Sequence, residues 1–226
     1  MKAQQVNLTS SYLPERLTGL QGRFILAEGE TQLDQVTGHL GDLLVQVQGG
    51  ITGGTGSIFR DFAVRISGDA AHMANLMPAK AVPPGTMEGM ASTIVVITGA
   101  SGAPHVRGEL ALMDSKITLP GIMEKPTGAP VTVTFEGDVE QSKHMTLTRV
   151  EIAAPPIRLP IKGKIQLGDK FFIDASLATG TLSLSSVPEW IVKGGLEAGN
   201  LELSLEIKGR ERDWHTWKTT GWLALS

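Results

Sequence analysis

The chain of 226 residues contains no cysteine, which excludes disulfides, cysteine nucleophiles and thiolate metal sites. Aromatic residues make up only 5% of it, and its 20 lysines and arginines form no run. Nucleic-acid binding needs clustered basic residues, so no nucleic-acid partner is expected. The chain also lacks an apolar run of the ~20 residues that a membrane span needs, and its first residues contain no apolar signal-peptide core.

Motifs that would mark an enzyme are equally scarce. The glycine-rich stretch Gly49–Gly56 lacks the Gly-Lys-Ser/Thr ending of a phosphate-binding loop, so we interpret it as a hairpin turn. A dispersed Ser-His-Asp triad stays open, because its members need not be close in the chain. Five histidines are scattered without metal-ligand spacing: His39, His72, His105, His144 and His215. We predict a protein that is not an enzyme, with no catalytic residues, no cofactor and no metal site.

What the chain does have is an internal repeat, since its second half resembles its first. Four residues recur 114 positions later (163 − 49 = 114): Leu33, Val36, Gly49 and Ile51 as Leu147, Val150, Gly163 and Ile165. Others recur 110 positions later (207 − 97 = 110), among them Ile97 as Ile207. The segment Gly108–Leu112 recurs as Gly221–Leu225, 113 positions later (221 − 108 = 113). A fixed period broken by small insertions predicts an array of similar structural units, and a function carried by a surface.

Alternation of apolar and polar residues dominates both halves. In the segment 201–208, the residues Leu201, Leu203, Leu205 and Ile207 share one face of a predicted strand, and charged or polar residues share the other. With 27 glycines and 12 prolines, the composition favours many strands joined by turns. A short helix is expected at residues 69–78, with Asp69 as the N-terminal cap, and single turns at residues 14–19 and 187–194. We predict an all-β fold: a curved, mostly antiparallel sheet of tandem repeats forming an open groove, with two β-sandwiches as the alternative.

The predicted organisation has three parts. Residues 1–19 form an N-terminal lead-in, residues 20–125 the first β unit and residues 126–226 the second. Because the last strand pattern stops at Ser226, where its counterpart in the first unit continues, we expect a fragment of a longer repeat protein.

Several segments resemble the AsmA-like envelope proteins, and among them the large YhdP-like members. The similarity lies in strand-and-turn patterns over most of residues 15–226, in the segments Val106–Gly121, Ile66–Ala70, Leu76–Pro78 and Gly194–Gly209. The resemblance implies a β-groove in the periplasm, anchored in the inner membrane by a segment outside this chain. It also implies a lipid-transfer bridge that conducts phospholipids between the inner and outer membranes. The family offers no catalytic residues to transfer.

Physical chemistry and the resemblance converge on one candidate ligand, a phospholipid or another acyl lipid. An aliphatic face must be buried against something, and each CH₂ group removed from water contributes about 0.8 kcal/mol. The residues expected to line this face are Val45, Val47, Val64, Ile66, Val95, Ile97, Leu203, Leu205 and Ile207. A closed structural or interaction module of the cell envelope is the alternative. A one-residue slip in register would exchange the two faces of any strand, above all in the run 94–97, where every residue is apolar.

Overall fold

The computed structural model describes residues 2–8, 15–53, 56–75, 85–120, 123–140, 144–167, 171–191, 199–211 and 214–226. These residues form sixteen connected strands. The first half contributes β1 (Lys2–Leu8), β2 (Leu17–Ala27), β3 (Glu30–Leu40), β4 (Leu43–Thr52), β5 (Ile58–Asp69), β6 (Thr86–Ala100), β7 (His105–Ala111), β8 (Ser115–Leu119) and β9 (Met123–Lys125). The second half contributes β10 (Thr132–Glu140), β11 (His144–Ala154), β12 (Ile157–Leu167), β13 (Phe172–Ala178), β14 (Leu182–Ser183), β15 (Asn200–Gly209) and β16 (Lys218–Leu225).

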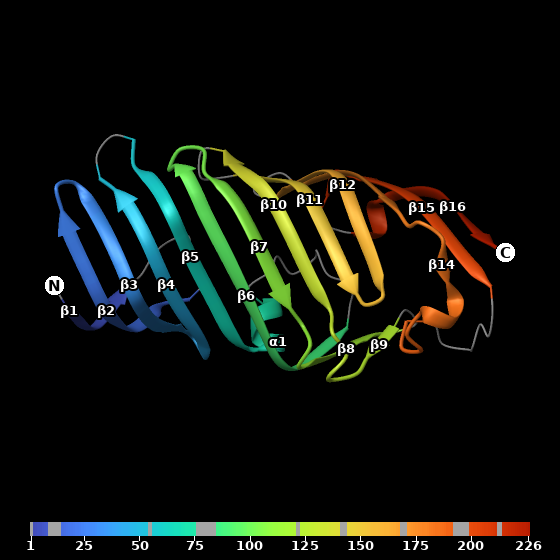
Figure 1. Cartoon of the computed structure of the whole chain (residues 1–226), viewed down its shortest axis with the longest axis horizontal. Helices are drawn as coiled ribbons and strands as arrows, with labels where there is room; N and C mark the ends of the chain where they lie inside the picture. Colours follow the sequence, from blue (N-terminus) through green and yellow to red (C-terminus); the bar gives the residue numbers. More distant parts are fainter. Residues whose placement is uncertain are drawn as a thin grey trace.

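The strands follow one another in space almost as they do in sequence (Figure 1). The path runs from β1 to β7, continues through β10 to β13 and reaches β15, which pairs with both β14 and β16. Every pair is antiparallel, and β8 and β9 form a short branch beside β6. The predicted all-β, antiparallel and open sheet is therefore confirmed, and the alternative of two separate sandwiches does not fit a single connected sheet.

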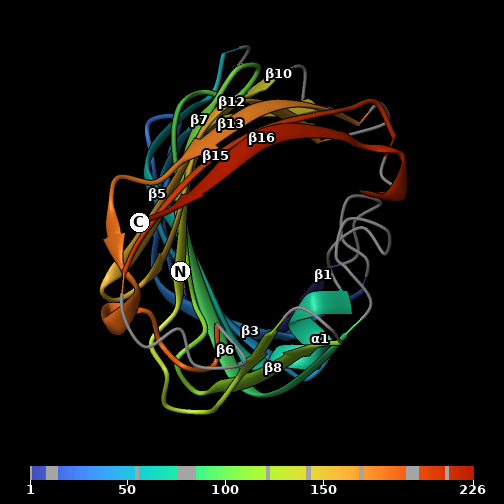
Figure 2. The same ribbon diagram turned by 90° about the vertical axis from the view of Figure 1, so that its right-hand side faces the viewer.

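The sheet curves so strongly that its cross-section approaches a ring (Figure 2). Register shifts interrupt seven of the strand pairings, including β2–β3, β3–β4, β4–β5 and β5–β6. Such bulges bend a strand and increase its twist. Two of them contain residues in the left-handed region, Gln35 with φ of 50° and Asp61 with φ of 45°. The bulges therefore contribute to the curvature of the sheet.

The interpretation of Gly49–Gly56 as a hairpin turn is wrong at its beginning. Gly49 and Gly50 lie inside β4, which continues to Thr52. Gly49 has a φ of 125°, and a Cβ atom there would lie 2.5 Å from the backbone oxygen of Asp61 in the bulge of β5. The absence of a side chain at Gly49 lets the backbones of β4 and β5 approach each other closely. The connection to β5 begins only after Thr52.

The internal repeat is visible in the pairing itself. In the first half β6 pairs with β7 from Ser92 opposite Ala111 to Thr98 opposite His105. Adding the sequence offsets of 110 and 113 gives the register of β15 with β16, in which Glu202 to Lys208 face Ala224 to Lys218. The two predicted units adjoin where β7 and β10 pair over seven residue pairs. Residues 1–19, predicted as a lead-in, include β1 and the start of β2.

The predicted short helix is present as α1 (Ala70–Asn75), and residues 76–78 of the predicted range lie outside the described residues. The Asp69 carboxylate accepts a hydrogen bond of 2.9 Å from the backbone N–H of His72, which is the expected N-terminal cap. Ala70 and Met73 of α1 are buried against Leu43 and Ala91 of the sheet. The helix therefore lies on the inner side of the curve (Figure 2), whereas β8 pairs beside the first residues of β6.

Candidate functional site

A single line of apolar residues crosses the inner face of the sheet from β3 to β16. Each member stands opposite the next in the strand register, so the line is fixed by backbone pairing. We call it the central line: Val36, Val47, Val64, Val95, Gly108, Phe135, Val150, Ile161, Leu177, Leu205 and Gly221. It contains no polar side chain over eleven strands. Apolar surface of this length is continuous, because no strand interrupts it.

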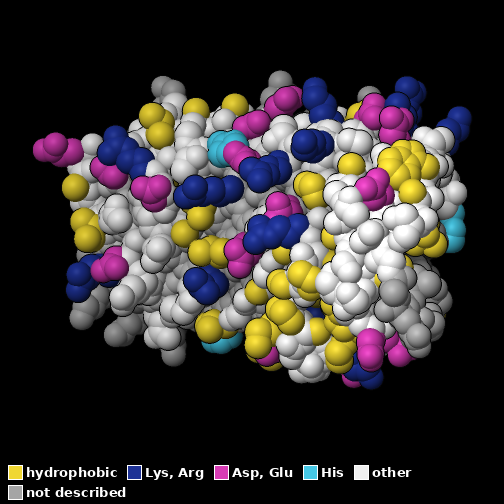
Figure 3. Space-filling model, turned by 45° about the vertical axis from the view of Figure 1, so that its right-hand side comes forward, with side chains coloured by type: hydrophobic (Ala, Val, Ile, Leu, Met, Phe, Trp, Pro, Cys, Tyr) yellow, Lys and Arg dark blue, Asp and Glu magenta, His cyan; other side chains and the backbone are white. Residues whose placement is uncertain are grey.

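The neighbouring line on the outer face has the opposite character. It starts at Gln48 and continues through the positions next to the central line. Its members are Gln48, Ala63, Val96, Arg107, Glu136, Arg149, Lys162, Ser176, Glu206 and Thr220. Basic and acidic side chains are interspersed over this outer surface (Figure 3). The outer face is thus suited to water, and the inner face is suited to an apolar partner or to packing against other apolar residues of the same chain.

All nine residues predicted to line the apolar face lie on the inner face. Val47, Val64, Val95 and Leu205 belong to the central line, and the other five occupy the adjacent inward positions of β4, β5, β6 and β15. In the apolar run of β6, the register places Val95 and Ile97 inward and Ile94 and Val96 outward. Val45 is buried at 5% exposure, whereas the other eight are half-buried. The predicted set therefore shares one surface that is only partly covered.

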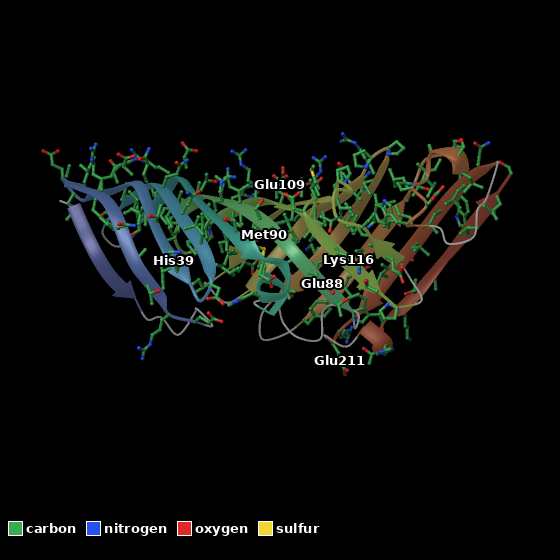
Figure 4. All side chains as sticks on the ribbon, turned by 90° about the horizontal axis from the view of Figure 1, so that it is seen from below. His39, Glu88, Met90, Glu109, Lys116 and Glu211 are labelled. Atoms are coloured by element: carbon green, nitrogen blue, oxygen red, sulfur yellow. The ribbon has the colours of Figure 1, made fainter. Side chains whose placement is uncertain are left out.

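A cover closes one border of the inner face. The buried cluster there joins inward-facing Leu43, Ala91, Leu112, Val131 and Ala154 of the sheet with α1, β8 and the partly buried Trp190 and Ile191. Glu88 of β6 and Lys116 of β8 stand opposite each other in the pairing that attaches this cover (Figure 4). The central line runs beyond the cover: Val36 and Leu177 are buried, whereas Val47, Val64, Val95, Val150 and Leu205 are half-buried.

Lys125 fastens the cover from within. It is fully buried, and its Nζ donates hydrogen bonds to the backbone oxygens of Ser115 at 2.5 Å, Pro126 at 3.1 Å and Met113 at 3.3 Å. Three carbonyl acceptors match the three donors of an ammonium group. Burial nevertheless lowers the pKa of Lys125, because the charged form loses water. The lysine ties β8 and β9 together and has no exposed surface for a ligand.

A second, smaller cover lies near β13 and β15. Phe171 and Trp217 stack with ring centroids 5.5 Å apart and an interplanar angle of 8°. Phe171 forms a buried cluster with Ile173 and Ala175, against which the partly buried Trp217 and Ile207 of the inner face pack. The Trp217 indole N–H donates to the Glu211 backbone oxygen at 2.8 Å, which satisfies its polar atom.

On the outer face, His105 lies between two carboxylates. His105 approaches Asp138 with 2.9 Å between Nδ1 and Oδ1, and Glu136 with 3.2 Å between Nε2 and Oε1. The hydrogen bond to Asp138 raises the pKa of His105 above its ordinary value, and Glu136 adds to the effect against the opposing cost of desolvation. Both ring nitrogens can donate only when the imidazole is protonated. This outer side is also where Glu109 points (Figure 4).

Sequence reasoning missed several residues of the central line in the second half. Phe135, Val150, Ile161 and Leu177 are as inward as the predicted members. The repeat was the available signal, because Val47 plus 114 is Ile161 and Val36 plus 114 is Val150. Phe135 lies over Gly108, where a Cβ atom would overlap the phenylalanine ring.

The remaining candidate features, a metal site and a membrane-spanning helix, find no support in the described residues. Within the described ranges, no group of three or more histidine, aspartate or glutamate residues is placed to hold a metal ion. Of the histidines, His72 and His105 face carboxylates. No helix in the described part of the chain is long and apolar enough to cross a membrane. Comparisons with models of known protein families, with curated proteins and with solved structures found no match.

Proposed function

We propose that this chain is a segment of a lipid-transfer bridge of the cell envelope, in which the inner face shields phospholipid acyl chains between the inner and outer membranes. The observation that carries the proposal is the central line: eleven positions on eleven successive strands with no polar side chain. The resemblance to AsmA-like proteins supports the same assignment.

The chemistry of the face suits an acyl chain. The members of the central line are aliphatic apart from Phe135 and the two glycines, and their side chains present no donor or acceptor that would select a polar ligand. Each CH₂ group that leaves water for this face gains about 0.8 kcal/mol, so a long tail gains several times that amount. Binding is non-directional, which permits a lipid to move along the face.

The length of the face favours transport over storage. Ten steps of about 4.8 Å lead along the central line from β3 to β16, which gives roughly 48 Å along the long axis of the sheet. Half of a bilayer's hydrocarbon core is about 15 Å thick, so a single tail covers only part of this path. A continuous surface several tails long offers successive equivalent positions.

The curvature shields the ligand from water. The ring-like cross-section encloses the inner face (Figure 2), and the charged outer line belongs to the opposite face of the same strands. The cover formed by α1, β8 and β9 protects one border. The single connected sheet supports this proposal over a closed structural module, which would bury its apolar residues in two sealed cores.

Native mass spectrometry of protein purified without detergent tests the proposal. The wild type is expected to carry phospholipid masses. Leu205→Glu places a charge on the inner face and is expected to lose them, together with lipid transport in cells. Ser204→Glu, on the outward position next to it, is the matched control and is expected to retain both. A wild-type protein that carries no lipid, or equal retention by both variants, contradicts the proposal.

A further inference from the structure

Two adjoining cavities lie on the outer face of the sheet, on the side opposite the central line. One has a volume of about 420 Å³, and Arg107 and Arg149 are among the residues that line it. The other has a volume of about 540 Å³ and is lined in part by Gln46 and Arg65. Ile94 lines both, so the two cavities are neighbours. Each volume lies within the range of about 300–1,000 Å³ that is usual for ligand sites. We call the two cavities together the outer trough.

The arginines of the outer trough have no partner within the part of the chain that the structure describes. Arg65, Arg107 and Arg149 are exposed, and none of them forms an ion pair or a side-chain hydrogen bond there. Glu136 stands directly opposite Arg107 and Arg149 in the register, but its carboxylate contacts His105 at 3.2 Å instead. Three guanidinium groups are therefore available to a ligand. Other arginines of the chain are engaged, at 3.5, 3.9 and 3.3 Å from a carboxylate: Arg23, Arg60 and Arg158.

Side chains that accept hydrogen bonds accompany the arginines. The amides of Gln35, Gln46 and Gln48 line the larger cavity, and each can both donate and accept. The Thr134 hydroxyl and the Glu109 carboxylate line the smaller one, and Glu109 points to the outer side (Figure 4). Basic and acidic side chains lie side by side over this face (Figure 3). Such a lining matches a ligand that is rich in hydroxyl groups and also carries anionic groups.

The spacing of the arginines indicates an elongated ligand whose charges are far apart. Arg65, Arg107 and Arg149 lie on β5, β7 and β11, so successive arginines are two strands apart, about 9.6 Å across the sheet. A nucleic-acid strand has one phosphate per about 3.4 Å, so most of its phosphates would face Glu109, Glu136 or no cation at all. An extended peptide cannot add as a strand here, because every strand from β4 to β11 on the main path already has a neighbour on each side.

We propose that the outer trough binds an acidic oligosaccharide. Its carboxylates pair with the guanidinium groups, whose fork of N–H donors matches a carboxylate bidentately. Its hydroxyl groups exchange hydrogen bonds with the glutamine amides, Thr134 and Glu109, and the apolar faces of its rings lie on Ile94 and Val96. The outer trough and the central line belong to opposite faces of the same strands, so this proposal and lipid transfer can each fail alone.

Isothermal titration calorimetry of the full chain with a galacturonic acid hexamer tests the proposal. Saturable binding is expected, and the neutral sugar maltohexaose is expected to bind about tenfold more weakly because it lacks carboxylates. Arg107→Gln and Arg149→Gln are each expected to weaken binding of the acidic hexamer about tenfold, since each removes a charged hydrogen-bond donor. Lys218→Gln is the matched control: it removes a positive charge from the outer face of β16, outside the outer trough, and is expected to bind like the wild type. Circular dichroism confirms that the variants are folded.

Competition separates an acidic sugar from other anions. A hexaglutamate peptide and a single-stranded oligothymidylate are added to the complex with the galacturonic acid hexamer, and neither is expected to displace it at an equal concentration. Four results would each overturn the proposal: no binding of the acidic hexamer, equal binding of maltohexaose, unchanged binding by both Arg107→Gln and Arg149→Gln, or displacement by either competitor. The last result would assign the outer trough to an acidic peptide or to a nucleic acid instead.

Discussion

Val95 and Val96 are neighbours in β6 that lie on opposite faces of the sheet. Val95 stands opposite Val64 and Gly108 in the central line. Val96 stands opposite Ala63 and Arg107 in the outer line. Both are half-buried valines in the same strand, so they differ chiefly in the face they occupy. Any difference between substitutions at these two positions therefore reflects the face on which the residue lies, because the residue type and the strand are the same.

The close backbone approach at Gly163 predicts a stability difference between two glycine substitutions. Gly163 has a φ of 133°, and a Cβ atom there would overlap the backbone oxygen of Asp174. Gly163→Ala is expected to destabilise the fold by about 1–3 kcal/mol. Gly180→Ala is the control, because nothing lies within 4 Å of its Cβ position. Thermal unfolding followed by circular dichroism measures both, and equal melting temperatures would show that position 163 tolerates a side chain.

The buried lysine of the cover predicts a second difference. Lys125→Met keeps much of the side-chain volume but leaves the three carbonyl acceptors at Ser115, Pro126 and Met113 without their donor. Since an unsatisfied buried polar group costs about 1–3 kcal/mol, a loss of about 3 kcal/mol in the free energy of unfolding is expected. Lys116→Met, at an exposed position of β8, is expected to change stability by less than about 0.5 kcal/mol. Denaturant unfolding compares the two variants, and a neutral Lys125→Met would contradict the fastening role.

The carboxylates around His105 predict a pH dependence of stability. Because the pKa of His105 is raised in the folded state, its stabilising contribution is fully present below the unfolded pKa of about 6.5. The contribution is lost as the pH rises through the folded-state pKa. His105→Gln is therefore expected to reduce the fall in melting temperature between slightly acidic and slightly alkaline pH. His39→Gln is the comparison, and an unchanged pH profile in His105→Gln would disprove the assignment.

The fold class and the inward set followed from local pattern, because alternation over several residues fixes which side chains share a face. Leu203, Leu205 and Ile207 needed only this rule. The run 94–97 did not yield to it, because four consecutive apolar residues are compatible with either orientation. Only the pairing of Val95 with Val64 and of Val96 with Ala63 decides between them.

Features that depend on contacts distant in sequence could not be predicted. Gly49 and Gly50 have the composition of a turn, yet they continue β4 because the bulge at Asp61 comes close to them. Lys125 has the composition of a surface residue, and its burial depends on carbonyls of β8 and the loop before it. The repeat predicts that Ile161 and Val150 lie on the inner face. Their exposed fractions depend on the curvature of the whole sheet, which no local sequence pattern predicts.

The most direct test of the central claim places a photo-reactive phenylalanine analogue at position 95 or at position 96 in cells and identifies what it cross-links. The account predicts that position 95 cross-links to phospholipid acyl chains and that position 96, one residue away on the outer face, does not. Lipid captured equally at both positions, or at position 96 alone, would contradict the claim that the inner face carries the lipid.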